Sequence, residues 1–270
     1  MKRSFQRLGL ALASLCLSAC TTLVSLPASP QNSPDPNAAQ ARQAWGRVLQ
    51  AHVNERGEVD FAALAEVHST GYQDLVLAVR HIAQTPLASL PEPETRLAHM
   101  VNAYNALSMF NVVASGIPDT HAGLNKVNFF VLRKFTIGGQ PMSLYVFEND
   151  IIRPLAREMG LPEVHFALNC SAVSCPVLPR VPFSASALRG ELLHEARTFF
   201  ASPRNWRIDS ATQTVWLSEI LKFYPEDFVP AHGRNLIEYG NRHAAQAAPL
   251  DFEVRFTPYD WTVANSRRKP

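Results

Sequence analysis

The sequence lacks the short motifs that announce the commonest enzyme chemistries. It has no phosphate-binding Walker loop, no glycine fingerprint for a dinucleotide and no Gly-x-Ser-x-Gly nucleophile elbow. His194-Glu195 has no second histidine at the spacing that a zinc protease requires, and Gly138-Gly139 fits a turn better than a phosphate-binding loop. We therefore expect no cofactor, and the function has to be argued from clusters of side chains.

The chain also lacks an excess of charge of either sign. It carries 25 Lys and Arg against 23 Asp and Glu, a formal net charge of +2. Lys2, Arg3 and Arg7 lie in a segment that we expect to be removed, and subtracting them leaves 22 basic against 23 acidic residues. No basic face remains, so the sequence predicts no nucleic-acid partner.

The N-terminal segment has the pattern of a secretory signal peptide over residues 1–19. A positively charged start precedes an apolar run at residues 8–17, which is too short to span a membrane. Leu17-Ser18-Ala19-Cys20 resembles a bacterial lipobox, which predicts a lipid on Cys20 and a membrane as partner. Because Thr21 rather than Asp follows, we expect an outer-membrane lipoprotein of the cell envelope with its domain in the periplasm. An ordinary cleaved leader is the alternative.

Cysteine is scarce, with four in the chain. Cys16 leaves with the leader and Cys20 takes the lipid, so Cys170 and Cys175 remain. Two closely spaced thiols in an exported protein are more often a disulfide than anything else. We therefore predict a Cys170–Cys175 disulfide. A loop of about six residues gains roughly 2 kcal/mol from such a bond in the chain-entropy model.

The pattern of apolar residues predicts one α+β domain over residues 40–265, mainly helical, with a small mixed or antiparallel sheet. A proline-rich tether (20–39) precedes the domain, and a loose basic tail (266–270) follows it. Predicted helices cover 39–53, 73–84, 94–115, 143–159, 184–200, 220–224 and 234–246. Predicted strands cover 129–132, 133–137, the first half of 164–176, 206–209, 214–217 and 252–256.

The helix at 94–115 is apolar around nearly its whole circumference, so we expect it to be buried. Asn102 and Asn105, three residues apart, then share one buried face. Buried amides need partners, so these two either clip loops in place or point into a site. On the helix that follows Ser143, Glu148, Asp150 and Arg153 are interpreted as a solvated face.

Reactive side chains concentrate in residues 164–176, where a short buried strand leads into a tight loop. We predict one polar pocket, with Asn102, Asn105, Asn169 and Ser174 as its binding residues. His165, Cys170 and Cys175 complete it. A metal site is not predicted, because spacing suggests no fourth ligand beside the two cysteines and the histidine.

Several segments together resemble the domain of unknown function 547 family. They are Val59-Asp60-Phe61, Asn102-Ala103-Tyr104-Asn105-Ala106-Leu107, residues 143–153, His165-Phe166-Ala167-Leu168-Asn169-Cys170, Ser174-Cys175-Pro176 and Tyr259-Asp260-Trp261. The resemblance spans about residues 40–265. It implies an exported or lipidated bacterial protein and no assigned activity. Plant members do not all carry both cysteines, which argues against schemes in which either thiol is indispensable across the family.

Two functions of different class stay open. One is a binding or scaffold module, stabilised by the disulfide. The other is a thiol hydrolase or acyl transferase on peptide or amide bonds, with Cys175 as nucleophile, His165 as base and Asn105 as orienter. The pattern of a buried helix and a following histidine is weakly similar to papain-like and transglutaminase-like folds. On a continuous strand, however, His165 and Cys170 would lie about 16 Å apart on opposite sides.

Overall fold

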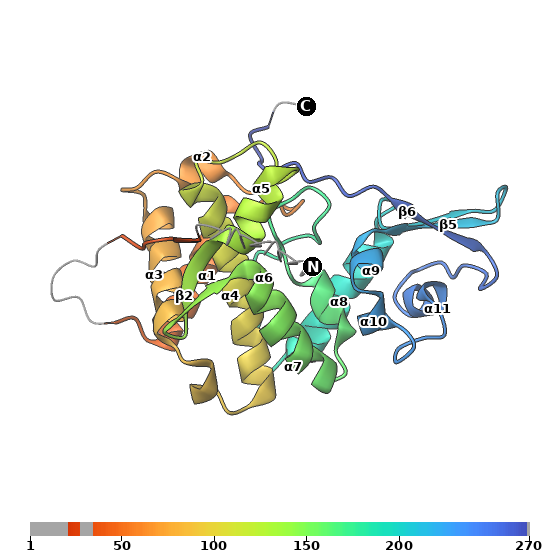
Figure 1. Ribbon diagram of the computed structural model, residues 1–270, viewed down its shortest axis with the longest axis horizontal. Coiled ribbons are helices and arrows are strands. Elements are labelled where there is room, and N and C mark those ends of the chain that lie inside the picture. The colour runs from red at the N-terminus through yellow and green to blue at the C-terminus, as the bar shows by residue number, and fades with distance from the viewer. Residues whose placement is uncertain (1–20, 28–34, 269–270) are drawn as a thin grey trace, which may run out of the picture.

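The longest helix, α4 (Pro93–Ala114), lies between two other groups of helices (Figure 1). The computed structural model describes residues 21–27 and 35–268, and in it α4 packs on α3 (Thr70–Gln84) on one side. On the other side it contacts the helical run formed by α6 (Leu144–Val146), η3 (Phe147–Ile152) and α7 (Arg153–Glu158). Its residues from Leu97 to Val112 are almost all buried, so the prediction of a buried central helix is confirmed.

The helix ends follow the chemistry of their terminal residues. α1 (Ala38–His52) begins at a capping box in which Asn37 and Gln40 bond to each other's backbone N–H. Ser69 caps α3, and Ser143 caps α6. Gly116 takes a φ of 77° immediately after α4, in the left-handed region that glycine tolerates best.

Two small mixed sheets complete the α+β fold, as the sequence predicts. In the first, β2 (Arg133–Ile137) pairs parallel with β1 (Thr22–Leu23) and antiparallel with β3 (Gln140–Ser143). Gly138 and Gly139, both with positive φ, form the tight turn between β2 and β3. In the second sheet, β5 (Thr214–Ser218) pairs antiparallel with β4 (Trp206–Asp209) and parallel with β6 (Glu253–Thr257).

The second sheet belongs to a separate cluster of buried aromatic residues, which includes Phe166, Phe200 and Phe228. The remaining elements are α2 (Phe61–Leu64), η1 (Leu87–Ser89), α5 (Leu124–Val127), η2 (Asn128–Leu132), η4 (Pro162–Phe166), α8 (Leu188–Ala201), α9 (Ile220–Phe223), α10 (Pro225–Phe228) and α11 (Leu236–Asn241). Figure 1 shows the half that carries β5, β6 and α11 set beside the larger helical half.

Two predicted strands are wrong. Residues 129–132 lie in η2, a π-helical segment, and residues 162–166 form η4, a 3-10 helix. Short apolar runs look alike in helices and strands, and here Pro162 sits in the first turn of η4, where its fixed φ suits a helix. The separation of His165 from Cys170 that a strand would impose therefore does not apply.

The predicted leader and the lipidation residue Cys20 lie outside the described residues, as does 28–34 of the tether. Among the helices that are described, none combines the length and the apolar character that crossing a membrane requires. At the other end of the chain, the backbone N–H of Ser266 donates to the Val59 carbonyl, and Arg267 pairs with Asp60 at 2.7 Å.

Candidate functional site

The loop after η4 is folded back on itself by the side chain of Asn169. Its Oδ1 accepts the N–H of Ser171 at 2.6 Å, and its Nδ2 donates to the Pro176 carbonyl at 2.7 Å. The first bond helps to hold Ser171 at a φ of 64°, a conformation that non-glycine residues rarely adopt. The Cys175 N–H then donates to the Ala172 carbonyl at 3.0 Å, so the chain reverses and the two cysteines meet.

The side chain of Asn105, on α4, binds the backbone at the start of this loop. Its Oδ1 accepts the N–H of Asn169 at 2.8 Å, and its Nδ2 donates to the Ala167 carbonyl at 2.9 Å. Asn102 does the same for another segment, because its amide bonds to both the N–H and the carbonyl of Phe183. Both side chains are therefore backbone clips, and they hold different parts of the chain.

Removal of the Asn105 clip gives a first prediction. We expect Asn105→Ala to lower the free energy of unfolding by about 1–3 kcal/mol for each of the two buried backbone groups left unpaired. Urea denaturation measures the difference. Asn125→Ala is the matched control, since that exposed amide makes one hydrogen bond and its loss should change stability by less than about 0.5 kcal/mol. Equal effects of the two variants would contradict the clip.

The sulfur atoms of Cys170 and Cys175 lie 2.7 Å apart, and both residues are free thiols. This corrects the predicted disulfide, because the separation exceeds the length of an S–S bond, about 2.05 Å. The Cys175 sulfur also accepts the N–H of Cys170 at 3.1 Å and the hydroxyl of Tyr259 at 3.2 Å. The Cys175 sulfur is thus in contact with two hydrogen-bond donors, in addition to the neighbouring thiol of Cys170.

The two thiols are electrostatically unequal. The pKa of Cys170 is raised well above its ordinary value, first by its hydrogen bond with Cys175 and then by burial. Burial also opposes ionisation of Cys175, but hydrogen bonds from Cys170, Tyr259 and the adjacent backbone lower its pKa below the ordinary value. Cys175 is also the more exposed of the pair. Cys175 is therefore the more acidic and the more accessible thiol of the pair.

Proximity of the thiols gives a second prediction. We expect a mild disulfide oxidant, such as oxidised glutathione in excess, to join them. Cys175 attacks the oxidant, one glutathione leaves as its thiol, and Cys170 then displaces the second from the mixed disulfide. Intact-mass analysis after alkylation with N-ethylmaleimide will show a species that has lost two hydrogens and takes up no label at either residue. Persistent double labelling would contradict the observed contact.

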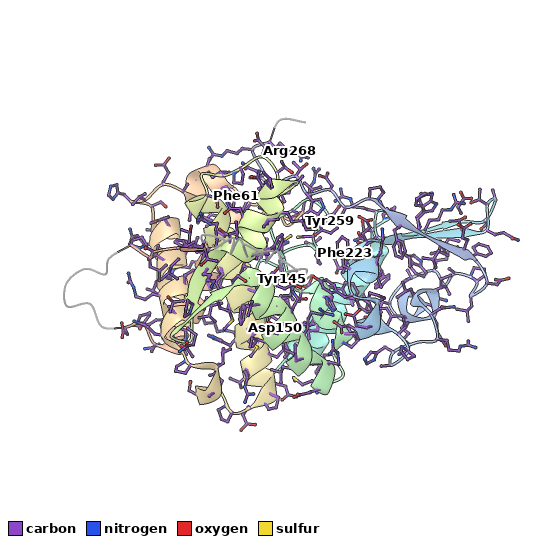
Figure 2. All side chains as sticks on the ribbon, in the orientation of Figure 1. Phe61, Tyr145, Asp150, Phe223, Tyr259 and Arg268 are labelled. Atoms are coloured by element: carbon purple, nitrogen blue, oxygen red, sulfur yellow. The ribbon has the colours of Figure 1, made fainter. Side chains whose placement is uncertain are left out.

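Both sulfurs line a cavity of about 60 Å³ between the two halves of the molecule. Figure 2 places Phe223 and Tyr259 at this junction, where their rings lie 5.6 Å apart. His165 of η4 and Glu148 of η3 line the same cavity. Its remaining walls are mostly apolar or aromatic, from Tyr104, Phe130, Leu168, Pro176, Ile220, Phe223, Tyr224, Tyr259 and Trp261.

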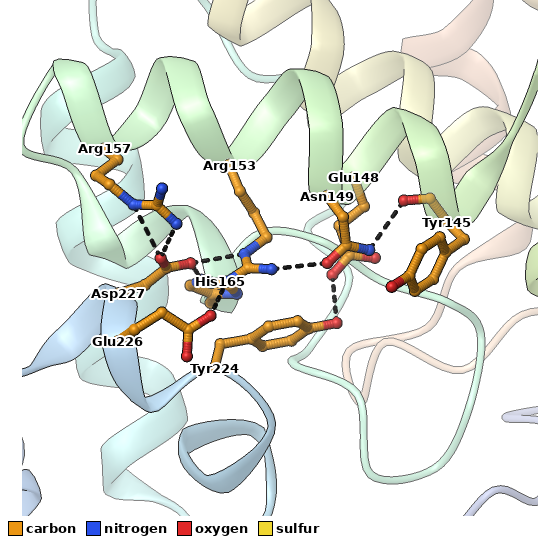
Figure 3. Close-up of polar contacts among 9 residues, drawn as sticks. All are labelled: Tyr145, Glu148, Asn149, Arg153, Arg157, His165, Tyr224, Glu226 and Asp227. Atoms are coloured by element: carbon orange, nitrogen blue, oxygen red, sulfur yellow. Dashed lines mark hydrogen bonds and ion pairs between the residues drawn. The ribbon is translucent and has the colours of Figure 1, made fainter.

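His165 is oriented by Asp227, which follows α9 in the chain. The Nε2 atom of His165 lies 2.8 Å from Asp227 Oδ2, and the same carboxylate accepts from Arg153 and Arg157 at 2.6 Å each (Figure 3). Burial opposes ionisation of Asp227, but hydrogen bonds from His165, Arg153 and Arg157 hold its pKa below the ordinary value. An ionised carboxylate can only accept, so Nε2 carries the proton and Nδ1 of a neutral His165 is the basic nitrogen.

Glu148 forms a second buried carboxylate at the cavity. Its two oxygens accept the hydroxyls of Tyr104 at 2.7 Å and Tyr224 at 2.8 Å. The Tyr224 ring is stacked on His165, with centroids 4.6 Å apart, and the Arg153 guanidinium lies 4.3 Å from its centroid (Figure 3). The interpretation of Glu148 and Arg153 as a solvated face is therefore wrong, since both are buried against the C-terminal half.

The structure thus brings together three of the predicted site residues, His165, Cys170 and Cys175. Ser174 lies beside them, where its hydroxyl accepts the Asp260 N–H at 2.9 Å and fixes the segment that supplies Tyr259. Asn102 lines a different cavity. The binding and catalytic roles assigned to these residues stay predictions.

Sequence reasoning missed Asp227, Tyr224 and Tyr259. The last of these lies in the Tyr259-Asp260-Trp261 motif, which was a usable signal. Across residues 21–27 and 35–268, no group of three or more His, Cys, Asp or Glu side chains is arranged to hold a metal ion.

These features define an α+β protein in which a pair of free thiols and a histidine–aspartate pair line or adjoin one cavity. A family model described as "Protein of unknown function, DUF547" matches residues 87–200, so this part of the chain is similar to that family. The match covers α4, the loop that carries Cys170 and Cys175, and α8 except for its last residue, and Asp227 and Tyr259 lie outside it. No curated protein and no solved structure matches the chain.

Proposed function

We propose that the protein is a thiol enzyme that transfers or hydrolyses acyl groups of peptide or amide bonds, with Cys175 as nucleophile. The observation that carries the proposal is the Cys175 sulfur itself. It accepts hydrogen bonds from Tyr259 and from the Cys170 N–H in a cavity that His165 also lines. A lowered thiol pKa beside an oriented imidazole is the arrangement that activates cysteine nucleophiles.

The chemistry follows from these positions. Nδ1 of His165 takes the proton of the Cys175 thiol, the sulfur forms a bond to the substrate carbonyl carbon, and the carbonyl π electrons move to oxygen. When that intermediate collapses, the C–N bond breaks and the amine leaves with a proton from His165. Water, or an acceptor amine, then attacks the thioester, gives its proton to His165 and releases the thiolate. Asp227, rather than the predicted Asn105, is the orienter in this scheme, because it bonds to Nε2 of the imidazole.

A binding module without covalent chemistry is the second candidate. The small volume of the cavity favours it, since about 60 Å³ holds roughly two water molecules and no substrate chain. A small polar ligand would then meet Glu148, His165 and the thiols. In this reading the loop is held by Asn105 and Asn169 rather than by the disulfide that the sequence predicts.

An activated acyl ester separates the two candidates. Incubated with p-nitrophenyl acetate, the enzyme should gain one acetyl group on Cys175 and lose it again with time, as intact mass and peptide mapping will show. A binding module will acquire no such transient adduct at this residue. Acetylation confined to surface lysines would count against the enzyme.

We also propose that the protein is a lipoprotein of the cell envelope, anchored through Cys20. The leader pattern and the lipobox resemblance support this, and Thr21 after the cysteine favours the outer membrane, with the domain in the periplasm. Mass spectrometry of the mature N-terminus tests the anchor. An acylated Cys20 is the expected result, and an unmodified Cys20 or cleavage elsewhere would overturn it.

A further inference from the structure

A second cavity, of about 250 Å³, lies between α1, α3, α4 and the segment around Phe183. It shares no lining residue with the thiol cavity. Its walls are formed largely by alanines and a few large apolar side chains, among them Ala41, Ala78, Ala98, Ala103, Trp45 and Phe183. Small side chains on three adjoining helices leave this space unfilled, in contrast to the dense packing usual inside proteins.

The walls of this cavity are fixed by polar contacts among the residues that line it. The Asn102 amide holds the backbone of Phe183 to α4 through bonds of 3.0 and 2.9 Å. Arg42 of α1 donates to the Phe183 carbonyl at 2.8 Å. The segment that closes the cavity is thereby tied to two helices, so the space is preformed rather than produced by a loose loop.

One buried polar atom in the walls has no hydrogen-bond partner among the described residues. Nε2 of His99 is buried and makes no hydrogen bond within the described part of the chain. Burial, followed by the nearby His81, lowers the pKa of His99 to about 4, so its imidazole is neutral at pH 7. His81 is occupied elsewhere, since its Nδ1 donates to the Pro36 carbonyl at 3.0 Å. Buried polar atoms normally find a partner, and a ligand hydroxyl in the cavity would supply one to His99.

We propose that this cavity binds a small uncharged aromatic molecule with one hydroxyl group, which hydrogen-bonds to His99 Nε2. Alanine walls accept the face of a ring, and a cavity of about 150 Å³ already holds benzene, so the volume suits one substituted ring. A charged ligand is disfavoured, because the exposed Arg42 already donates to two backbone carbonyls and the other walls are largely apolar. The site is independent of the chemistry proposed for Cys175.

Calorimetric titration of the full chain with p-cresol and with toluene tests this proposal. The two probes have similar shape, and only p-cresol carries a hydroxyl. We expect p-cresol to bind at one site, with toluene about five- to tenfold weaker, because toluene leaves the imidazole nitrogen unpaired. The absence of saturable p-cresol binding, or equal affinity for both probes, would overturn the assignment.

Two variants locate the binding. His99→Phe keeps a ring of similar size but removes the nitrogen, so its preference for p-cresol over toluene should disappear. Ala98→Leu fills the cavity and should weaken both probes at least tenfold, while alkylation of Cys175 continues at the wild-type rate and shows that the chain is folded. His68→Phe, at an exposed histidine, is the matched control. Wild-type binding by His99→Phe would contradict the proposal, whatever Ala98→Leu does.

Discussion

Replacing Cys175 by serine should abolish acetyl transfer from p-nitrophenyl acetate to the protein. Serine presents a hydroxyl whose pKa is far above that of a thiol, and its oxygen cannot replace the polarisable sulfur as a nucleophile at neutral pH. We expect the rate of acetylation to fall at least a hundredfold. The release of p-nitrophenolate measures this rate. Residual acetylation at the wild-type rate would show that another residue reacts with the ester.

Cys170→Ser is the matched control for this experiment. It removes the neighbouring thiol, but the Cys170 N–H and the Tyr259 hydroxyl still converge on the Cys175 sulfur. We expect acetylation to continue, slowed by no more than about tenfold, because one of the interactions that lower the Cys175 pKa is lost. Were Cys170→Ser inactive and Cys175→Ser active, the roles of the two thiols would be reversed.

Asp227→Asn should lower the free energy of unfolding of the protein. The variant leaves the buried Arg153 without its most buried counterion and removes the charge that also faces Arg157 and His165. Breaking a buried ion pair from one side typically costs about 3–5 kcal/mol, and Glu226 still contacts Arg153, so we expect about 3 kcal/mol. Guanidinium denaturation at pH 7 measures it.

The loss should depend on pH in a defined direction. Because the folded pKa of Asp227 is depressed, its ionised form contributes stability above the unfolded value, near 3.9, and that contribution falls as the pH drops below it. The difference between wild type and Asp227→Asn should therefore be constant from pH 7 to about 5 and shrink towards pH 3. Asp74→Asn is the control, since its partner Arg47 is exposed and its loss should cost less than about 1 kcal/mol. A pH-independent difference would contradict the account.

Most helices could be predicted from the sequence because their apolar residues recur at helical spacing and their ends carry clear signals. Asn37, Ser69 and Ser143 cap helices as their chemistry requires, and Gly116 follows the end of α4. The strand predictions for two short segments were wrong for a physical reason. A segment of five residues with a few apolar side chains fits a strand or one helical turn, and 128–132 and 162–166 are helical.

The candidate site was predictable only where its residues are close in sequence. His165, Cys170 and Cys175 lie within one stretch, and the structure confirms that they meet at one cavity. Asp227 lies 62 residues beyond His165, and nothing in a local pattern distinguishes it from a surface acid. Glu148 and Arg153 were predicted to be solvated for the same reason. Their burial depends on the C-terminal half, which covers the helix and is distant in sequence.

The central claim is that Cys175 is an activated thiolate, and the pH dependence of its alkylation tests this most directly. Iodoacetamide reacts with the thiolate, so the rate of Cys175 modification, followed by peptide mass analysis on reduced wild-type protein, traces its ionisation. The account predicts a midpoint clearly below the ordinary cysteine value of about 8.5, shifted upward by Tyr259→Phe. A midpoint at or above that value, unmoved by Tyr259→Phe, would contradict it.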